Sequence, residues 1–286
     1  MTRVNRAANA AQAQRWNGTS GQYWIANRER HITGRRYLIP YLFDAADISS
    51  GERVLDIGCG CGETTIMAAR AARRSGFNAT GFAVGLDLSR PMLTVARQLA
   101  EQANVNNVRF VQGDAQIRPV RRESCNVIIS SFGVMFFEDP AKAFTGLADA
   151  ICPNGRLAFL CWRNDSQNEL LAIPLQAFSS YMLSPSPAPE DLFVDPQQVT
   201  ELLSDSGWRN IQIRAITEPA WMGSDVADVM SYVRGMPVVR GLAASLKDDM
   251  LSERVLATIS EQYAARQRSD GVWVRAAAWL VTAIHS

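Results

Sequence analysis

The sequence has few residues of the kinds that bind metals. It contains two histidines in 286 residues, His31 and His285, and its five cysteines include no CxxC pair. Cys59 and Cys61 alone do not make up the tetrahedral ligand set of a structural zinc site. We therefore expect no metal site. An odd set of scattered cysteines also favours free thiols, which predicts a reducing, cytoplasmic environment.

Neither sign of charge is in excess, and long apolar stretches are absent. The chain has 29 basic and 28 acidic residues, and basic pairs such as Arg35-Arg36 are scattered along it as surface residues usually are. Nucleic-acid-binding domains commonly carry a strongly basic face, so we expect no nucleic-acid partner. No run approaches the ~20 apolar residues of a membrane-spanning helix, and the polar start lacks the apolar core of a signal peptide. These features predict a cytoplasmic protein without a membrane span.

Residues 53–162 contain short apolar runs that alternate with stretches of helical spacing. This alternation is typical of β-α-β units, which form a parallel sheet covered by helices, and it predicts an α/β fold. The expected strands are 54–57, 83–86, 108–111, 127–129 and 157–160. The expected helices are 64–74, 90–103 and 140–151.

The regions on either side of this core predict helices and the remaining strands. Aromatic and charged residues between 12 and 47 have helical spacing. The Ser- and Pro-rich run 184–189 predicts a loop, which is either a plain connection or a mobile lid. A helix is expected at 196–206, strands at 211–216 and 276–283, and helices over 219–270. The expected division is a helical lid (1–50), a cofactor-binding core (51–162), an irregular insertion (163–195), and a C-terminal part of the sheet (196–286) with a helical substrate cap at 219–272.

The strongest local pattern is VLDIGCGCG at residues 54–62, where an apolar strand runs into alternating glycines. Glycines at such a turn let the backbone bend sharply and leave space for a ligand. Dinucleotide sites have the spacing GxGxxG and hold a pyrophosphate, whereas the spacing here is GxGxG. The carboxylate of Asp56, two residues before Gly58, would repel a pyrophosphate but attract the ammonium group of S-adenosylmethionine (SAM). The pattern therefore favours SAM over a nicotinamide dinucleotide.

Two further carboxylates end the next two expected strands, Asp87 in GLDLS and Asp114 in QGDAQ. Because the carboxyl ends of parallel strands meet at one edge of a sheet, Asp56, Asp87 and Asp114 should lie close together. Asp87 can accept hydrogen bonds from ribose hydroxyls, and Asp114 can accept one from an adenine amino group. Each residue alone could instead cap a helix or lie on the surface. Their coincidence at three successive strand ends indicates a nucleoside site.

Together these motifs resemble those of the class I SAM-dependent methyltransferases, especially the ubiquinone/menaquinone and small-molecule branch. The resemblance covers residues 50–162 and is carried by VLDIGCGCGETT (54–65), VGLDLSRPML (84–93), VRFVQGDAQ (108–116), IISSFGVMFFEDPAKAF (128–144) and ICPNGRLAFLCW (151–162). It implies a Rossmann-like seven-stranded sheet whose last strand is antiparallel. Cys61 departs from the Thr or other small residue that the family often has there, and we expect no change of cofactor from it. The resemblance implies SAM-binding roles for Asp56, Gly58, Cys59, Gly60, Asp87, Leu88, Met92, Asp114, Ala115 and Ser130.

Large apolar residues are frequent where this fold places the acceptor of the methyl group. The N-terminal helices and the later insertions of the fold cover the cofactor, so they should determine which acceptor is bound. We expect an apolar pocket and a small, largely apolar acceptor of the natural-product or quinone type. Many of these side chains could instead only pack helices against the sheet. The candidates for the pocket are Trp24, Phe132, Met135, Phe136 and Trp162.

Two residues near the N-terminus are candidates for catalysis. Methyl transfer from a sulfonium is an in-line displacement, so the enzyme mainly has to align the reacting groups and exclude water. If the acceptor must lose a proton, His31 is the natural base because its ordinary pKa lies near neutrality. Its polar surroundings at 27–31 favour the alternative that it is exposed to solvent. Tyr23 could close over the cofactor or contact the acceptor.

Other functions are compatible with the same residues. A SAM-binding cyclase or a non-catalytic SAM-binding protein would keep the whole cofactor site, and an NAD-dependent oxidoreductase is a weaker alternative because of the glycine spacing. The sequence leaves open the acceptor molecule, whether the acceptor atom is oxygen, nitrogen or carbon, and whether a base is used. It also leaves open the oligomeric state, a homo-oligomer included.

Overall fold

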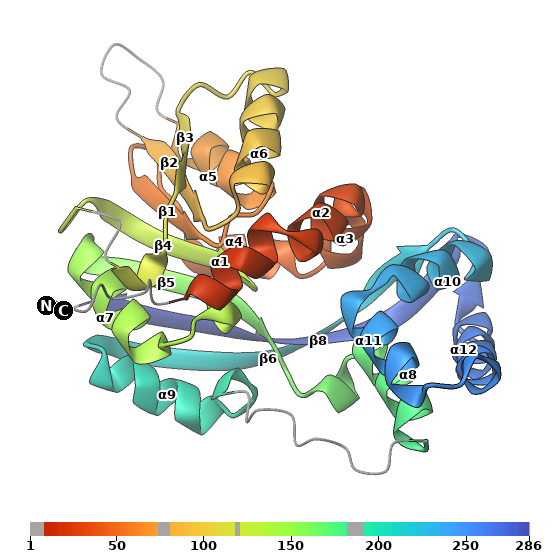
Figure 1. Ribbon diagram of the computed structural model, residues 1–286. Coiled ribbons are helices and arrows are strands. Elements are labelled where there is room, and N and C mark those ends of the chain that lie inside the picture. Colours follow the sequence, from red (N-terminus) through yellow and green to blue (C-terminus); the bar gives the residue numbers. More distant parts are fainter. Residues whose placement is uncertain (1–8, 74–80, 118–120, 182–191, 286) are drawn as a thin grey trace, which may run out of the picture.

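The computed structural model describes residues 9–73, 81–117, 121–181 and 192–285. Its centre is one sheet with the strand order β3-β2-β1-β4-β5-β8-β6 (Figure 1). The pairs from β3 to β5 are parallel, and β8 is antiparallel to both of its neighbours. The expected seven-stranded arrangement with an antiparallel last strand is confirmed, and a two-residue strand, β7, adds to β8. The strands are β1 (Arg53–Ile57), β2 (Phe82–Asp87), β3 (Val108–Gln112), β4 (Cys125–Ser131), β5 (Ile151–Trp162), β6 (Trp208–Gly223), β7 (Gln267–Arg268) and β8 (Gly271–His285).

Two helices of the core, α6 (Arg90–Gln102) and α7 (Pro140–Ala150), begin where their sequences provide caps. Ser89 precedes α6 and accepts a hydrogen bond from the Met92 backbone N–H, and the carboxylate of Asp139 accepts one from the Lys142 N–H at the start of α7. A proline in the first turn of each helix suits the fixed φ of that residue. The expected helices at 90–103, 140–151 and 196–206 are confirmed within a residue or two, and the one expected at 64–74 is α5, although residue 74 lies outside the described residues. The helices that cover the sheet are α5 (Glu63–Ala72), α6 (Arg90–Gln102), α7 (Pro140–Ala150) and α9 (Pro196–Asp205).

The two C-terminal strands are longer than expected. The prediction that residues 219–223 are helical is wrong, because β6 continues through Pro219 to Gly223. Proline is tolerated there because β6 is the edge strand among the described residues and pairs with β8, where Pro219 faces Arg275. The paired ends of β6 and β8 extend beyond the parallel strands and carry a separate group of helices (Figure 1).

The insertion after β5 is also more regular than expected. The sequence predicts an irregular insertion at 163–195, but α8 (Glu169–Ser179) lies within it and packs on α12 (Asp249–Ala264) and β8. Pro174 inside this helix disfavours the helical interpretation of the sequence. The buried side chains of Ala172, Ile173 and Phe178 outweigh that preference by packing against the neighbouring elements. The expected loop at 184–189 lies outside the described residues.

The remaining helices form two groups. The N-terminal helices are α1 (Ala10–Asn17), α2 (Thr19–Ala26), α3 (Arg28–Arg35) and α4 (Ile39–Ala46), as the sequence predicts. Helix α4 packs on β4 and β5, α2 contacts α6, and α3 contacts β6. The second group, which we call the cap, consists of α10 (Val226–Gly235), α11 (Pro237–Leu246) and α12 (Asp249–Ala264) together with α8. Within the described ranges no helix is both long and apolar enough to cross a membrane.

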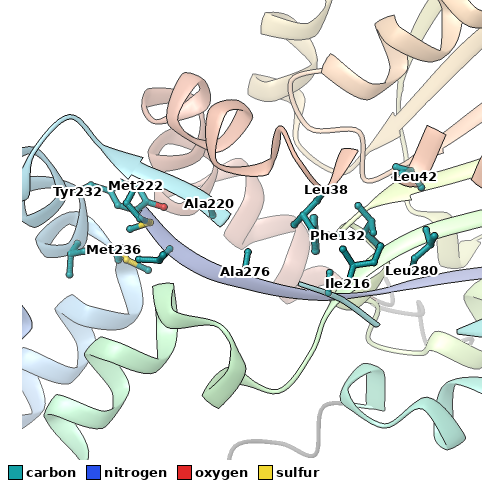
Figure 2. Packing of buried hydrophobic residues seen from close by; sticks show 14 of the residues in the cluster. Leu38, Leu42, Phe132, Ile216, Ala220, Met222, Tyr232, Met236, Ala276 and Leu280 are labelled. Atoms are coloured by element: carbon teal, nitrogen blue, oxygen red, sulfur yellow. The ribbon is translucent and has the colours of Figure 1, made fainter. Parts of the chain in front are cut away.

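One buried apolar cluster joins the sheet to the cap (Figure 2). It runs along β6 and β8, from Leu280 and Ile216 beside the parallel strands to Met222 at the far end of β6. At this end of β6, Tyr232 of α10 and Met236, which follows α10, complete the cluster. Since the cluster is continuous, burial of its apolar surface stabilises the cap and the sheet together.

Candidate cofactor and acceptor site

A cavity of about 390 Å³ lies at the carboxyl ends of the parallel strands, under the N-terminal helices. Crevices at this edge of an α/β sheet are the usual position of ligands. No residue of the region 219–272 lines this cavity, so the expected substrate cap does not form its wall. The predicted site residues that do line it are Trp24, Gly58, Cys59, Gly60, Asp87, Leu88, Met92, Asp114, Ala115, Phe132, Phe136 and Trp162. Those that do not are Tyr23, His31, Asp56, Ser130 and Met135.

The glycine-rich bend after β1 forms the floor of the cavity. Gly58 and Gly60 have φ of 66° and 55°, in the left-handed region that favours glycine. A Cβ at Gly58 would lie 2.7 Å from the Cα of Gly133, so the fold itself excludes a side chain there. A Cβ at Gly60 would meet only Met92 Sδ and Trp24 Nε1, each at 3.8 Å. The protein therefore leaves open space beside Gly60 that a ligand can occupy.

Asp87 lies at the end of β2 with its carboxylate beside the bend. Its Oδ2 accepts a hydrogen bond from the Gly60 N–H at 2.8 Å, and its Oδ1 accepts one from the Ser89 N–H at 2.8 Å. Burial raises the pKa of this carboxyl, and the two backbone donors oppose that rise. A carboxylate has about four lone-pair positions, so each oxygen keeps an acceptor position for a hydroxyl group. The geometry fits the two hydroxyls of a ribose.

Asp114, which follows β3, has one carboxylate oxygen that accepts no hydrogen bond from the described residues. Its Oδ1 accepts hydrogen bonds from the Gln116 N–H at 2.9 Å and from Asn9 Nδ2 at 3.4 Å. Its Oδ2 is buried and has no hydrogen-bond partner among the described residues. A buried acceptor without a donor is unfavourable by about 1–3 kcal/mol. An amino group of a ligand in the cavity, such as that of adenine, would satisfy it.

Asp56 is fully buried behind the bend rather than on the cavity wall. Its Oδ2 accepts hydrogen bonds from the hydroxyls of Thr64 and Thr65, both at 2.7 Å, while its Oδ1 has no partner among the described residues. Burial raises the pKa of this carboxyl from 3.8 to about 7, although the threonine hydroxyls oppose the rise. Ser130 is likewise behind the wall, donating from its hydroxyl to the Ile57 carbonyl at 2.8 Å.

In the ligand-free protein, the pH dependence of the free energy of unfolding should reveal the titration of the Asp56 carboxyl. Because its folded pKa of about 7 exceeds the ordinary value of 3.8, the folded state binds this proton more tightly than the unfolded chain does between those two values. Its contribution to the free energy of unfolding should therefore decline as the pH rises through that window. Asp56→Asn is neutral at every pH and keeps an acceptor for the threonines, so it should remove this part of the slope. Urea unfolding of both proteins across the window measures the difference, and parallel pH profiles would refute the assignment.

His31 and Arg35, on α3, lie above the cavity with Trp24. The His31 ring stacks on the Trp24 ring at 3.9 Å, and the Arg35 guanidinium lies 5.4 Å from the centre of the same indole. His31 is partly buried rather than solvent-exposed, which corrects the favoured alternative of the sequence analysis. Burial, together with the charges of Arg35 and Arg30, lowers the pKa of His31 to about 3. An imidazole so hard to protonate is a weak base near neutral pH.

Tyr23, the second predicted catalytic residue, connects α2 to the cap. Its hydroxyl donates to the Tyr232 carbonyl at 2.9 Å, and the two rings stack with centres 5.7 Å apart. Arg30 makes a parallel connection, because its guanidinium pairs with the Asp228 carboxylate and donates to the Met222 carbonyl. The cap thus supports the helices that cover the cavity.

Part of the cavity wall is aromatic. The rings of Phe132 and Trp162 stack at 3.9 Å, and Trp16 meets Phe136 edge to face at 5.0 Å. Phe132 has φ of 65°, which is uncommon for a residue with a side chain and is found mostly at sites where structure around it fixes the backbone. Met135 lies behind this wall, where its sulfur accepts a hydrogen bond from the Trp162 N–H at 3.2 Å.

The structure adds Arg35 to the lining of the cavity, a residue that the sequence analysis assigned to the surface. The sequence offers no signal for it, because Arg35 follows a run of charged residues on a short helix. Among the described residues no group of three or more His, Cys, Asp or Glu side chains is arranged to hold a metal ion.

The fold and the cavity together define an α/β protein with a cavity at the carboxyl edge of its sheet whose size and polar groups suit an adenosyl group. Asp87, the open bend and the unpaired Asp114 oxygen fit SAM, whereas Asp56 does not reach the cavity.

Comparison with known proteins gives the family. A family model described as a methyltransferase domain matches residues 48–207, more than half of the chain. The chain is 31% identical over 118 residues to the aklanonic acid methyltransferase DauC of Streptomyces sp. (strain C5), covering 41% of this chain and 51% of that protein. It is 27% identical over 197 residues to the ubiquinone/menaquinone biosynthesis C-methyltransferase UbiE of Marinomonas sp. (strain MWYL1), covering 68% and 75%. The crystal structure of YcgJ from Bacillus subtilis superposes with a TM-score of 0.56 at 17% identity, covering 87% of this chain and 98% of that one.

The chain therefore belongs to the class I SAM-dependent methyltransferases, in the ubiquinone/menaquinone and small-molecule branch, and SAM is the cofactor of this family. The alignment spans about half the length of DauC, the first of these relatives.

Proposed function

We propose that the protein transfers the methyl group of SAM to an oxygen, nitrogen or carbon atom of a small, largely apolar molecule. The observation that carries the proposal is that one cavity joins the adenosyl-binding groups to the aromatic wall of Phe132, Phe136 and Trp162. The names of two relatives support it, since DauC is named for aklanonic acid and UbiE for ubiquinone and menaquinone. A quinone-like or other aromatic metabolite is the acceptor class that such a wall favours.

The proposed roles follow from the position of each side chain. Asp87 would hold the ribose and Asp114 the adenine, and the space beside Gly60 would receive the chain that leads to the sulfur atom. SAM supplies the electrophilic methyl group when it is bound. The apolar wall and the helices above it would align the acceptor and exclude water, which is the main requirement of an in-line displacement.

Catalysis is not assigned to His31 or Tyr23. Neither lines the cavity, and the low basicity of His31 does not suit a general base. We propose instead that both residues hold the helices above the cavity in place. Tyr23 fixes α2 to the cap, and His31 packs against Trp24. The five free cysteines support the prediction of a reducing, cytoplasmic environment.

A binding assay and a transfer assay together test the proposal. Isothermal titration calorimetry should show binding of S-adenosylhomocysteine, the demethylated product, and no binding of NADH at the same concentrations. SAM with an isotopically labelled methyl group, incubated with a panel of phenols, hydroquinones and apolar amines, should then give a labelled product. Binding of NADH without S-adenosylhomocysteine would identify an oxidoreductase. Turnover of a substrate with the label retained on SAM would identify a cyclase or another non-transferring protein.

A further inference from the structure

Arg35 has hydrogen-bond donors that the protein does not use. Its Nε donates to the His31 carbonyl at 3.0 Å and its Nη1 donates to Ser131 Oγ at 3.2 Å. A guanidinium carries five N–H donors, so two bonds leave three without a partner in the part of the chain that the structure describes. Those donors belong to Nη1 and Nη2, and the side chain lines the cavity. The two bonds hold the guanidinium in place and leave one side of it for a ligand.

The positive charge of Arg35 has no ion-pair partner among the described residues. No carboxylate of a described residue lies within ion-pair distance of it, whereas Arg28 on the same helix pairs with Glu63 at 3.3 Å and Arg30 pairs with Asp228. Burial lowers the pKa of Arg35, an effect that the negative charge of Glu63 opposes only in part, and the charge of Arg35 is one of those that lower the pKa of His31. A partly buried cation without a partner is unfavourable, and an anion bound in the cavity would relieve it.

The strand order indicates which part of the cofactor would reach the Arg35 guanidinium. The sheet runs β3-β2-β1-β4, with Asp114 after β3, Asp87 at the end of β2 and Gly60 after β1. In the proposed function these positions hold the adenine, the ribose and the chain that leads to sulfur. The next position in the same direction is the end of β4, where Ser131 accepts the hydrogen bond from Arg35. An extended SAM molecule therefore ends, at its amino-acid group, beside Arg35.

We propose that Arg35 is a carboxylate-binding residue of the cavity and that the amino-acid carboxylate of SAM is its ligand. The inference rests on the proposed function, because it takes the direction of the cofactor from it. A guanidinium fits a carboxylate with two parallel hydrogen bonds, which a lysine ammonium group cannot reproduce. A carboxylate of the methyl acceptor has the same chemistry and is the other source that the experiment has to distinguish.

The test compares two ligands that differ only in the carboxylate. S-adenosylhomocysteine and its decarboxylated form share the adenine, the ribose and the ammonium group. Calorimetry on the wild-type protein should show that S-adenosylhomocysteine binds at least about tenfold more tightly, as expected for charge-assisted hydrogen bonds. Arg35→Met should reduce this preference to near unity by weakening S-adenosylhomocysteine alone, and Arg35→Lys should restore only part of it.

Arg214→Met is the matched control, because the Arg214 guanidinium lies over the ring of Tyr41, 5.1 Å from its centre, and neither residue lines the cavity. It removes one positive charge away from the cavity and should leave the preference unchanged. Thermal melting of both variants shows whether they fold.

The other outcomes separate the explanations. One outcome is that Arg35→Met leaves the preference intact, while 1-naphthoate binds the S-adenosylhomocysteine complex of the wild type and not that of the variant. The carboxylate that Arg35 binds is then that of the acceptor, and the assignment to the cofactor carboxylate is overturned. Equal binding of the two ligands by the wild type, without binding of 1-naphthoate, overturns the role of Arg35 and leaves the proposed function standing. Failure of both ligands to bind the wild type overturns the proposed function itself.

Discussion

Asp87→Ala is expected to weaken the binding of S-adenosylhomocysteine by about 10- to 100-fold, because hydrogen bonds to a charged group contribute about 1.5–3 kcal/mol. The variant removes the acceptors for the ribose and also the acceptor that holds the Gly60 N–H in the bend. The same loss should be seen with 5′-methylthioadenosine, which keeps the ribose and lacks the amino-acid group. Calorimetry with both ligands measures it, and this pattern differs from that of Arg35→Met, which should affect only the ligand with a carboxylate.

Asp195→Ala is the control for the structural part of this change. Asp195 accepts a hydrogen bond from the Gln197 N–H at 2.9 Å, as Asp87 does from the Ser89 N–H, but it is the N-cap that precedes α9 and does not line the cavity. Its removal should lower the melting temperature slightly and leave ligand binding intact. An Asp87→Ala protein that binds both ligands as the wild type does would exclude the ribose role.

Gly60→Val is expected to abolish the binding of S-adenosylhomocysteine while the chain still folds. Apart from Gly60 and its two chain neighbours, no described atom lies closer than 3.8 Å to the position of a Cβ at Gly60, so the valine side chain would enter the open space of the cavity. The left-handed φ of 55° makes the substitution unfavourable by roughly 1–2 kcal/mol or more, a loss that a chain of this size can sustain. Calorimetry and circular dichroism on the same sample measure binding and folding.

Gly207→Val separates the backbone strain from the block of the cavity. Gly207 also has a left-handed φ, 88°, and a Cβ there meets nothing within 4 Å, but the residue lies in the turn between α9 and β6. Gly207→Val should destabilise the protein to a similar degree without weakening the binding of S-adenosylhomocysteine. If Gly60→Val bound S-adenosylhomocysteine normally, the cofactor would lie elsewhere.

The strand ends of the cofactor site could be predicted from the sequence because the signals are local. An apolar run followed by a carboxylate or a glycine sets the end of each parallel strand, and the topology of such sheets then brings those ends to one edge. Asp87 and Asp114 line the cavity for this reason. Asp56 follows the same rule along the chain, yet its carboxylate turns to Thr64 and Thr65 on the following helix, and neither spacing nor composition indicates that direction.

The parts that could not be predicted depend on contacts between distant segments. Arg35 looks like a surface residue in the sequence, and its position over the cavity follows from the packing of α3 on β6. Proline disfavours regular structure at positions 174 and 219, but burial in α8 and the edge position of β6 allow Pro174 and Pro219 to be accommodated. Local propensity was overridden in each case by tertiary packing.

The position of β8 between β5 and β6 also sets the order in which the sheet can be assembled. A nascent chain that emerges from the ribosome makes β5 and β6 first, but these strands are not neighbours and cannot pair until β8 follows the cap helices. During that interval the backbone groups at one edge of β5 and along β6 lack their final partners, and such edges favour association with other chains. Fast formation of α10, α11 and α12, whose contacts are local, would shorten the time for which those edges are exposed.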